Sequence, residues 1–93
     1  MAPDVPYRVE LSPSAARDVN RIPPRYLAAI VEFIYGPLAE NPHRVGGELR
    51  GELTGSRSAR RGSYRVLYTI VEDDRVVVVH RVDHRATAYR PRG

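Results

Sequence analysis

The 93-residue sequence contains no cysteine and no lysine. Without cysteine, the chain can form no disulfide, no thiolate nucleophile and no thiolate-bound zinc site. A small fold without such cross-links is typical of a reducing compartment, so we expect a cytoplasmic protein. The first residues lack the basic flank and apolar run of an export signal, and no stretch approaches the roughly 18 apolar residues that a membrane span requires. We therefore expect a soluble protein with no membrane partner.

Because lysine is absent, all fifteen basic side chains are arginines. A guanidinium is planar, permanently charged and weakly hydrated, so it forks onto phosphate oxygens and stacks on bases. The codon usage of a GC-rich genome would remove lysine without a functional reason, and this alternative stays open. It does not explain why so many arginines cluster in the C-terminal half of the chain. The clustered residues are Arg57, Arg60, Arg61, Arg65, Arg75, Arg81, Arg85, Arg90 and Arg92.

The overall charge indicates a polyanionic partner. The formal net charge is +4 and the isoelectric point is near 10.0, which favours nucleic acid as the target. The composition, 42% hydrophobic and 28% charged, is ordinary for a globular protein. A chain of this length buries only about 60 to 65% of the surface that it exposes when unfolded. We therefore expect one small domain, residues 1–93, with a thin core.

Hydrophobic periodicity in the first forty residues predicts a strand followed by two helices. Residues 7–11 alternate apolar and charged side chains, as a half-buried strand does. Ser12-Pro13 supplies an N-cap and a first helical residue, and Pro23-Pro24 ends the short helix that follows. Apolar residues then recur at helical spacing through residues 25–40, with an interruption expected at Gly36-Pro37. The two helices are expected to form an αα-hairpin.

Three further strands are predicted in the second half of the chain. They are residues 57–61, 64–71 and 75–82. These segments are rich in β-branched and aromatic residues, and turn signals at Gly62-Ser63 and at residues 72–74 separate them. Before them, a glycine-rich passage leaves room for one short strand at residues 49–53.

The expected turn lengths decide which arginines share a face of the sheet. If Gly62-Ser63 is the whole first turn, Arg60 stands opposite Arg65. A three-residue turn at residues 72–74 then places Arg81 beside Arg65. Like charges on neighbouring strands repel, so this row of arginines is expected to require an anion, either a phosphate or the carboxylate of a partner.

Three motifs carry a resemblance to a known family. They are Leu49-x-Gly51, the Gly-x-Tyr-Arg-Val-x-Tyr strand of residues 62–68 and the terminal His-Arg-x-x-x-Tyr of residues 84–89. Together with the element order β-α-α-β-β-β, they resemble the RelE/ParE toxin superfamily over nearly the whole chain. The resemblance implies an α+β fold, in which a small, twisted, mainly antiparallel sheet packs against an N-terminal helical hairpin.

The resemblance also implies a function. RelE-type members are toxins of type II toxin–antitoxin modules that cleave messenger RNA in the ribosomal A site and thereby inhibit translation. No metal or other cofactor is expected, and the three histidines lack the ligand spacing of a zinc site. The expected partners are the 70S ribosome with its A-site message and a cognate antitoxin, which masks the basic face. The complex with the antitoxin could bind operator DNA through the antitoxin.

The resemblance assigns roles to residues in the last two strands and the tail. Arg65 matches the strand arginine of the family, Arg85 matches its second arginine, and Tyr89 matches the tyrosine that acts near the attacking hydroxyl. The best-known members carry lysines just before this strand, where this chain has Ser56 and Ser58. Neighbouring arginines could supply the missing charge, namely Arg57, Arg60 and Arg61.

Cleavage of RNA through its own 2′-hydroxyl needs a proton acceptor, a proton donor and cations on the developing phosphorane charge. Arginine is a poor proton donor, so we expect Arg65 and Arg85 to bind phosphate and stabilise charge. Tyr89 is then the expected general base, and His84 is a supporting acid or substrate contact. The other expected RNA contacts are Arg57, Arg60, Arg61, Arg81 and Arg90.

Other interpretations stay open. Arg65 could be a structural arginine paired with Glu48 or Glu52, and Tyr89 could merely cap the sheet. A ParE-like toxin would poison DNA gyrase through protein contacts and would need no general base, although the ending with Arg85 and Tyr89 is not expected in such chains. A third alternative is an inhibitor that binds RNA or the ribosome without cleaving it.

Overall fold

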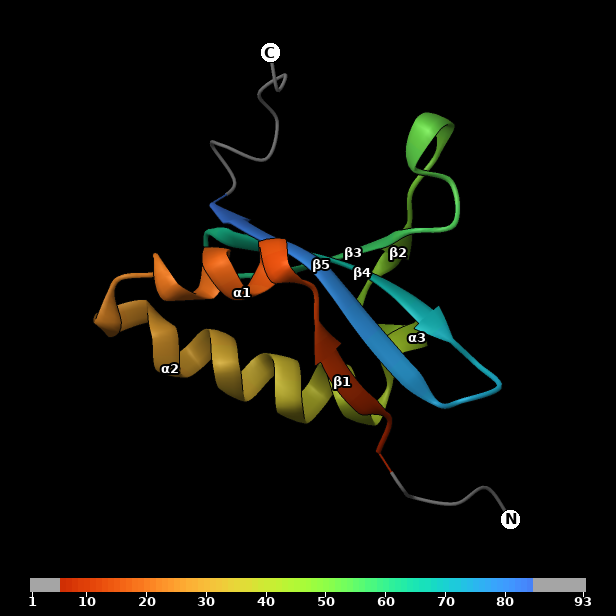
Figure 1. Cartoon of the computed structure of the whole chain (residues 1–93), viewed down its shortest axis with the longest axis horizontal. Helices are drawn as coiled ribbons and strands as arrows, with labels where there is room; N and C mark the ends of the chain where they lie inside the picture. Colours follow the sequence, from red (N-terminus) through yellow and green to blue (C-terminus); the bar gives the residue numbers. More distant parts are fainter. Residues whose placement is uncertain (1–5, 85–93) are drawn as a thin grey trace.

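Residues 6–84 are the residues that the computed structural model describes, and they form a five-stranded sheet with helices on one face (Figure 1). The strands are β1 (Arg8–Leu11), β2 (Gly47–Glu48), β3 (Arg57–Arg61), β4 (Tyr64–Val71) and β5 (Val76–His84), and the α-helices are α1 (Pro13–Asn20), α2 (Pro24–Phe33) and α3 (Pro42–Val45). The strand order is β1-β5-β4-β3-β2, with β1 parallel to β5 and the other pairs antiparallel. The predicted α+β class and mainly antiparallel sheet are confirmed.

The helix α1 starts at Pro13 after the N-cap Ser12, as the sequence predicts. Ser12 is the N-cap: its Oγ accepts a hydrogen bond from the N–H of Ala15 at 3.0 Å, and Pro13 occupies the first helical position. The Ser12 hydroxyl also donates to the carbonyl of His80 at 3.0 Å, and the Ser12 N–H donates to the carbonyl of Val79 at 2.9 Å. The cap therefore joins α1 to β5 as well as starting the helix.

The second helix changes its pitch where an interruption was predicted. Pro24 begins α2, which continues into a π-helical turn, Ile34–Leu38, that contains Gly36-Pro37. Proline has no N–H to donate and its ring crowds the preceding turn, so the backbone widens there. Pro42 then begins α3, a short helix that leads into the glycine-rich passage. Within residues 6–84, no helix is long and apolar enough to cross a membrane.

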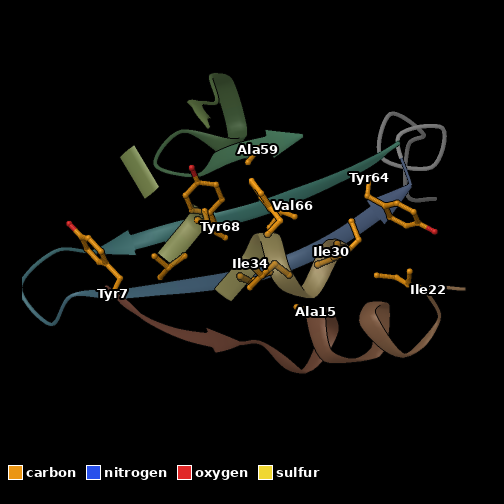
Figure 2. Close-up of a cluster of buried hydrophobic side chains, with 14 residues drawn as sticks. Tyr7, Ala15, Ile22, Ile30, Ile34, Ala59, Tyr64, Val66 and Tyr68 are labelled. Carbon is orange, nitrogen blue, oxygen red and sulfur yellow. The ribbon is translucent and has the colours of Figure 1, made fainter. Parts of the chain in front are cut away.

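The core lies between the helices and one face of the sheet, here called the core face (Figure 2). Along β4, the side chains of Tyr64, Val66 and Tyr68 are buried in it. Figure 2 shows a long cluster of side chains that reaches from Tyr7 at one end to Tyr64 at the other. Successive side chains of a strand point to opposite faces, so Arg65 lies on the other face, here called the outer face.

The strand predicted at residues 49–53 is wrong. The edge strand β2 comes earlier in the chain, at Gly47–Glu48, and pairs with β3. Gly51–Leu53 instead form a 3-10 turn. The reason is the backbone of Gly51, whose φ of 74° is a left-handed conformation that a continuous strand does not adopt.

The predicted register is confirmed for the first hairpin. Arg60 lies opposite Arg65, as the Gly62-Ser63 turn requires. Their side chains therefore share the outer face of neighbouring strands.

In the second hairpin the predicted register is wrong. The turn contains four residues, 72–75, rather than three, because its last residue adopts a left-handed φ of 50°. The register then shifts at His80, which has no partner in the ladder, as in a β-bulge. As a result Arg65 lies opposite Asp83, whereas Arg81 lies opposite Leu67. The prediction that Arg81 lies beside Arg65 is therefore wrong.

Candidate functional site

A groove on the outer face of the sheet contains two of the predicted site residues. Its volume is about 460 Å³, and it is open to solvent. The lining residues are Gly47, Glu48, Leu49, Ser58, Arg60 and Arg65. The strands β2, β3 and β4 thus build one surface from chain segments that only sheet pairing brings together.

Arg60 and Arg65 are the cations of this groove. They occupy facing positions on β3 and β4, where Cβ atoms lie about 5 Å apart. Arg65 is half-buried and Arg60 is exposed. Two guanidinium groups at facing positions repel unless an anion reduces the repulsion. Asp83, opposite Arg65 on the next strand, is one such anion within the fold. The guanidinium of the exposed Arg60 matches the oxygens of a phosphate from outside.

The surroundings of Arg65 hold it on the outer face. Tyr64 and Val66, on either side, are buried in the core, so β4 cannot rotate without exposing them. On the next strand, Asp83 lies opposite Arg65 and is only 9% exposed. Sequence reasoning missed this carboxylate, because its position depends on both the four-residue turn and the bulge at His80, and the bulge has no local signal.

Arg81, a predicted RNA contact, binds two carboxylates of the protein. Its Nε and Nη2 donate to Asp18 at 2.8 and 3.3 Å, and its Nη2 donates to Asp83 at 3.1 Å. Asp18 is 8% exposed and also accepts a hydrogen bond from the N–H of Val82 at 2.9 Å. The hydrogen bond to Asp18 raises the pKa of Arg81 above its usual value. This geometry indicates a structural role for Arg81, which joins α1 to β5, and does not support direct RNA contact.

Arg57, another predicted RNA contact, is held in the same way. Its side chain is 16% exposed, and its Nη2 donates to the carbonyls of His43 and Gly46, both at 2.8 Å. Its Nη1 lies 3.5 Å from the carboxylate of Glu48. Arg57 therefore fixes the connection between α3 and β2 against β3, and its geometry does not support a direct RNA contact.

Arg61 lies at the end of β3, outside the groove. Its cross-strand partner is Tyr64, whose side chain is in the core. Arg61 is exposed and lines a different cavity, of about 350 Å³, together with Glu32 and Phe33. Arg60 borders this cavity as well as the groove.

His84 lies on the core face rather than the outer face. It stands opposite Tyr64, and the two rings make an edge-to-face contact with their centroids 5.3 Å apart. Asp83 precedes it on β5 and stands opposite Arg65, so His84 and Arg65 are on opposite faces of the sheet. The structure therefore does not bring His84 and Arg65 together in one site.

Three predicted site residues, Arg85, Tyr89 and Arg90, lie outside the described residues, and their roles stay predictions. In the sequence, Arg85 comes directly after His84, and Tyr89 and Arg90 come five and six positions after it. Of the predicted residues within 6–84, Arg60 and Arg65 line the outer-face groove. Arg60 and Arg61 share the cavity of about 350 Å³, and Arg81 and His84 line a cavity of about 230 Å³ beside Tyr64.

Known proteins similar to this chain share its length and its fold. A family model described as the ParE toxin of type II toxin–antitoxin system, parDE, matches residues 9–89. Toxin RelG of Mycobacterium tuberculosis is 54% identical over 86 residues, which are 92% of this chain and 99% of that relative. Toxin RelE of the same organism is 47% identical over 90 residues, 97% of this chain and 93% of that relative. The structure of the toxin–antitoxin complex RelBE2, also from M. tuberculosis, matches with a TM-score of 0.84 and 54% identity, over 87% of this chain and 100% of that chain.

Proposed function

The chain belongs to the RelE/ParE superfamily of toxins from type II toxin–antitoxin systems, and we propose that it cleaves messenger RNA in the ribosomal A site and so inhibits translation. The observation that carries this proposal is the outer-face groove, where Arg60 and Arg65 face each other on neighbouring strands. A phosphate backbone along the groove would reduce the repulsion between the two guanidinium groups.

In the proposed reaction the RNA supplies its own nucleophile. A 2′-hydroxyl loses its proton to a base and attacks the adjacent phosphorus, and the bond from phosphorus to the 5′-oxygen breaks. The 5′-oxygen takes up a proton from water, so the products carry a 2′,3′-cyclic phosphate and a 5′-hydroxyl. Negative charge develops on the phosphate oxygens as the new bond forms. A preorganised cation lowers the energy of that transition state more than it lowers the energy of the bound substrate.

The roles follow from the chemistry of each group. Arg65 binds the reacting phosphate, because a guanidinium group can donate two parallel hydrogen bonds to phosphate oxygens and the core holds its strand in place. Arg60, which is exposed, contacts a neighbouring phosphate of the RNA backbone. We propose Arg85 as a second cation at the phosphate and Tyr89 as the base that accepts the proton of the 2′-hydroxyl. The position of His84 on the core face does not support its action at Arg65.

A cognate antitoxin is the second proposed partner. The similar structure from M. tuberculosis is a toxin–antitoxin complex. The net charge of +4 favours an acidic partner that covers the basic face. In this proposal the antitoxin masks the outer-face groove, and the complex binds operator DNA through the antitoxin.

Poisoning of DNA gyrase is the alternative function, because the matching family model is described as a ParE toxin. That activity would use contacts between proteins and would need neither a phosphate groove nor a general base. It therefore predicts an intact message and a defect in DNA supercoiling.

The proposed function is tested by primer extension on a message that purified ribosomes translate in the presence of the toxin. We expect cuts within codons, and we expect Arg65→Ala to reduce the cleavage rate about 100- to 1000-fold, the usual effect of removing one charge-stabilising donor. The variant should fold, because the Arg65 side chain lies on the outer face and not in the core. Arg8→Ala is the matched control, since Arg8 is an exposed arginine on β1, at the opposite edge of the sheet from β2.

Two results would contradict this function. An intact message together with inhibited gyrase would support the ParE-like alternative. An intact message with the toxin still bound to ribosomes would support an inhibitor that binds without cleaving.

A further inference from the structure

Another, smaller cavity lies between α1 and the end of β5. Its volume is about 200 Å³, and it is lined by Ser14, Arg17, Asp18, Arg21 and Arg81. It shares no lining residue with the outer-face groove. Its lining contains three guanidinium groups and one carboxylate, and because Arg81 pairs with that carboxylate, the formal charge of +2 belongs to Arg17 and Arg21. Because a water molecule occupies roughly 30 Å³ in the liquid, the cavity has room for a phosphate group and several waters.

Helical spacing brings the polar side chains of this cavity together. Ser14, Arg17, Asp18 and Arg21 are three, four and seven residues apart, which places them on one stripe of α1. The hydrogen bonds between Asp18 and Arg81 show that this stripe faces β5. In Figure 1, α1 lies alongside β5.

The carboxylate of Asp18 does not neutralise the two helix arginines. Its oxygens accept hydrogen bonds from Arg81 and from the N–H of Val82, so its charge is balanced by β5. Arg17 and Arg21 are both exposed. Within residues 6–84, neither of them has a carboxylate at ion-pair distance. Two cations of α1 therefore remain for an anion from outside.

The cavity also contains a hydroxyl donor. Arg17 Nη2 donates to Ser14 Oγ at 3.3 Å, which leaves the hydroxyl proton of Ser14 for another acceptor. Guanidinium and hydroxyl groups are the donors that bind the oxygens of a phosphate. The donor set and the volume of the cavity both fit a phosphodiester group.

We propose that this cavity, here called the α1–β5 site, binds a backbone phosphate of ribosomal RNA while the outer-face groove holds the message. The inference rests on the proposed function, since it assigns a ribosomal contact to the same toxin. Arg81 on β5 and Arg60 on β3 are two strands apart, which is about 10 Å at the usual spacing of strands. Phosphate contacts at two separate sites position a protein on its target as well as attracting it. The α1–β5 site thus orients the groove toward the message.

The α1–β5 site is tested with the double variant Arg17→Gln/Arg21→Gln in the full chain. Arg8→Gln/Arg25→Gln is the matched control, because it removes the same charge from exposed arginines outside the cavity. Binding to purified 70S ribosomes is measured at several salt concentrations. We expect the double variant to bind about 10-fold more weakly and its salt slope, log K against log[salt], to fall by about 1, whereas the control keeps the slope of the unaltered chain.

A second measurement reads the site without the ribosome. In ¹⁵N NMR spectra of the free toxin, inorganic phosphate should shift the side-chain Nε–H signals of Arg17 and Arg21 and leave that of Arg8 in place. If phosphate shifts these signals but the toxin does not cleave the message, the proposed function is wrong and the α1–β5 site still binds an anion. The opposite outcome has three parts: the unaltered toxin cleaves the message, phosphate does not shift these signals, and the double variant keeps the salt slope of the unaltered chain. It would overturn the α1–β5 site and leave the proposed function in place.

Three further outcomes would overturn the assignment to ribosomal RNA. Arg17 and Arg21 lie near the C-terminal end of α1, where cations also stabilise the helix dipole. If that is their only role, the double variant loses thermal stability and keeps its ribosome affinity. If the site binds an acidic antitoxin, the affinity for the antitoxin falls and that for ribosomes does not. If the site binds the message, affinity for a short single-stranded oligoribonucleotide falls as much as affinity for ribosomes.

Discussion

Asp18 is a single residue on which the end of β5 depends. The strand β1 pairs with β5 only up to Val79, so β1 leaves the following residues of that edge without a strand partner. Asp18 replaces the missing strand partner at this edge. Its carboxylate accepts hydrogen bonds from the N–H of Val82 and from the guanidinium of Arg81. A buried backbone N–H without an acceptor is costly. A side chain of α1 therefore completes the hydrogen bonding of an edge strand.

Asp18→Asn is expected to lower the free energy of unfolding by about 2 to 4 kcal/mol, because the amide nitrogen would face a donor and Arg81 would lose one of its two buried counter-charges. Chemical denaturation checks this value. Asp73→Asn, in the exposed turn after β4, is the control and should change stability by less than about 0.5 kcal/mol. An equal effect of the two substitutions would contradict the role of Asp18.

At the level of elements, the connection from α3 to β2 sets one wall of the outer-face groove. Tyr68 donates a hydrogen bond to the carbonyl of Pro42 at 2.6 Å, and Arg57 donates to the carbonyl of Gly46 at 2.8 Å. The backbone of Gly46 passes close to both β3 and β4. A Cβ at this position would contact the Tyr68 hydroxyl and would lie 2.7 Å from the carbonyl oxygen of Ser58.

Gly46→Ala is therefore expected to push β2 away from β3 and to cost about 1 to 3 kcal/mol, as overpacking usually does. Gly47→Ala is the neighbouring control, since a Cβ there meets nothing within 4 Å. Thermal unfolding of both variants checks the difference, and about 4 to 8 °C is expected per kcal/mol in a domain of this size. If Gly46→Ala unfolds at the same temperature as Gly47→Ala, β2 is not held by this close approach.

On the scale of the whole molecule, one cluster joins three distant parts of the chain at the Tyr7 end of the core. Tyr7 donates a hydrogen bond to Glu72 Oε2 at 2.5 Å, and His43 Nε2 lies 2.7 Å from Glu72 Oε1. The guanidinium of Arg75 lies over the Tyr7 ring, 4.2 Å from its centroid. The start of β1, the helix α3 and the turn between β4 and β5 therefore meet at one carboxylate.

This cluster makes stability depend on pH in a defined direction. The hydrogen bond from Tyr7, and then that from His43, lower the pKa of Glu72 below its usual value of 4.5. A carboxylate whose pKa is lower in the folded state stabilises the fold above its unfolded pKa, and this contribution is lost as the pH falls below 4.5 through the folded pKa.

Glu72→Gln should therefore unfold at a lower temperature than the unaltered chain at pH 7, and the difference should shrink as the pH falls through the acid range. Asp74→Asn, from the same exposed turn, is the control. Thermal unfolding followed by circular dichroism from pH 7 to pH 3 checks this expectation. A difference that stays constant with pH would mean that Glu72 acts by packing and not by its charge.

The class of fold and most of its elements could be predicted from the sequence, because their signals act over a few residues. Ser12 caps a helix three residues away, Pro37 breaks helical hydrogen bonding where it stands, and alternation along β4 assigns its two faces. The same local reasoning placed Arg60 opposite Arg65, since a two-residue turn fixes the register of the strands beside it.

The composition of the site depends on contacts between residues that are far apart in the chain. Arg81 and Asp18 are 63 residues apart, so no spacing in the sequence marks them as a pair. The four-residue turn and the bulge at His80 each shifted β5 by one residue, so Asp83 rather than Arg81 became the neighbour of Arg65. Composition and periodicity identified an arginine-rich surface, and packing across the sheet selected which arginines face outward, because buried guanidinium groups must be paired within the fold.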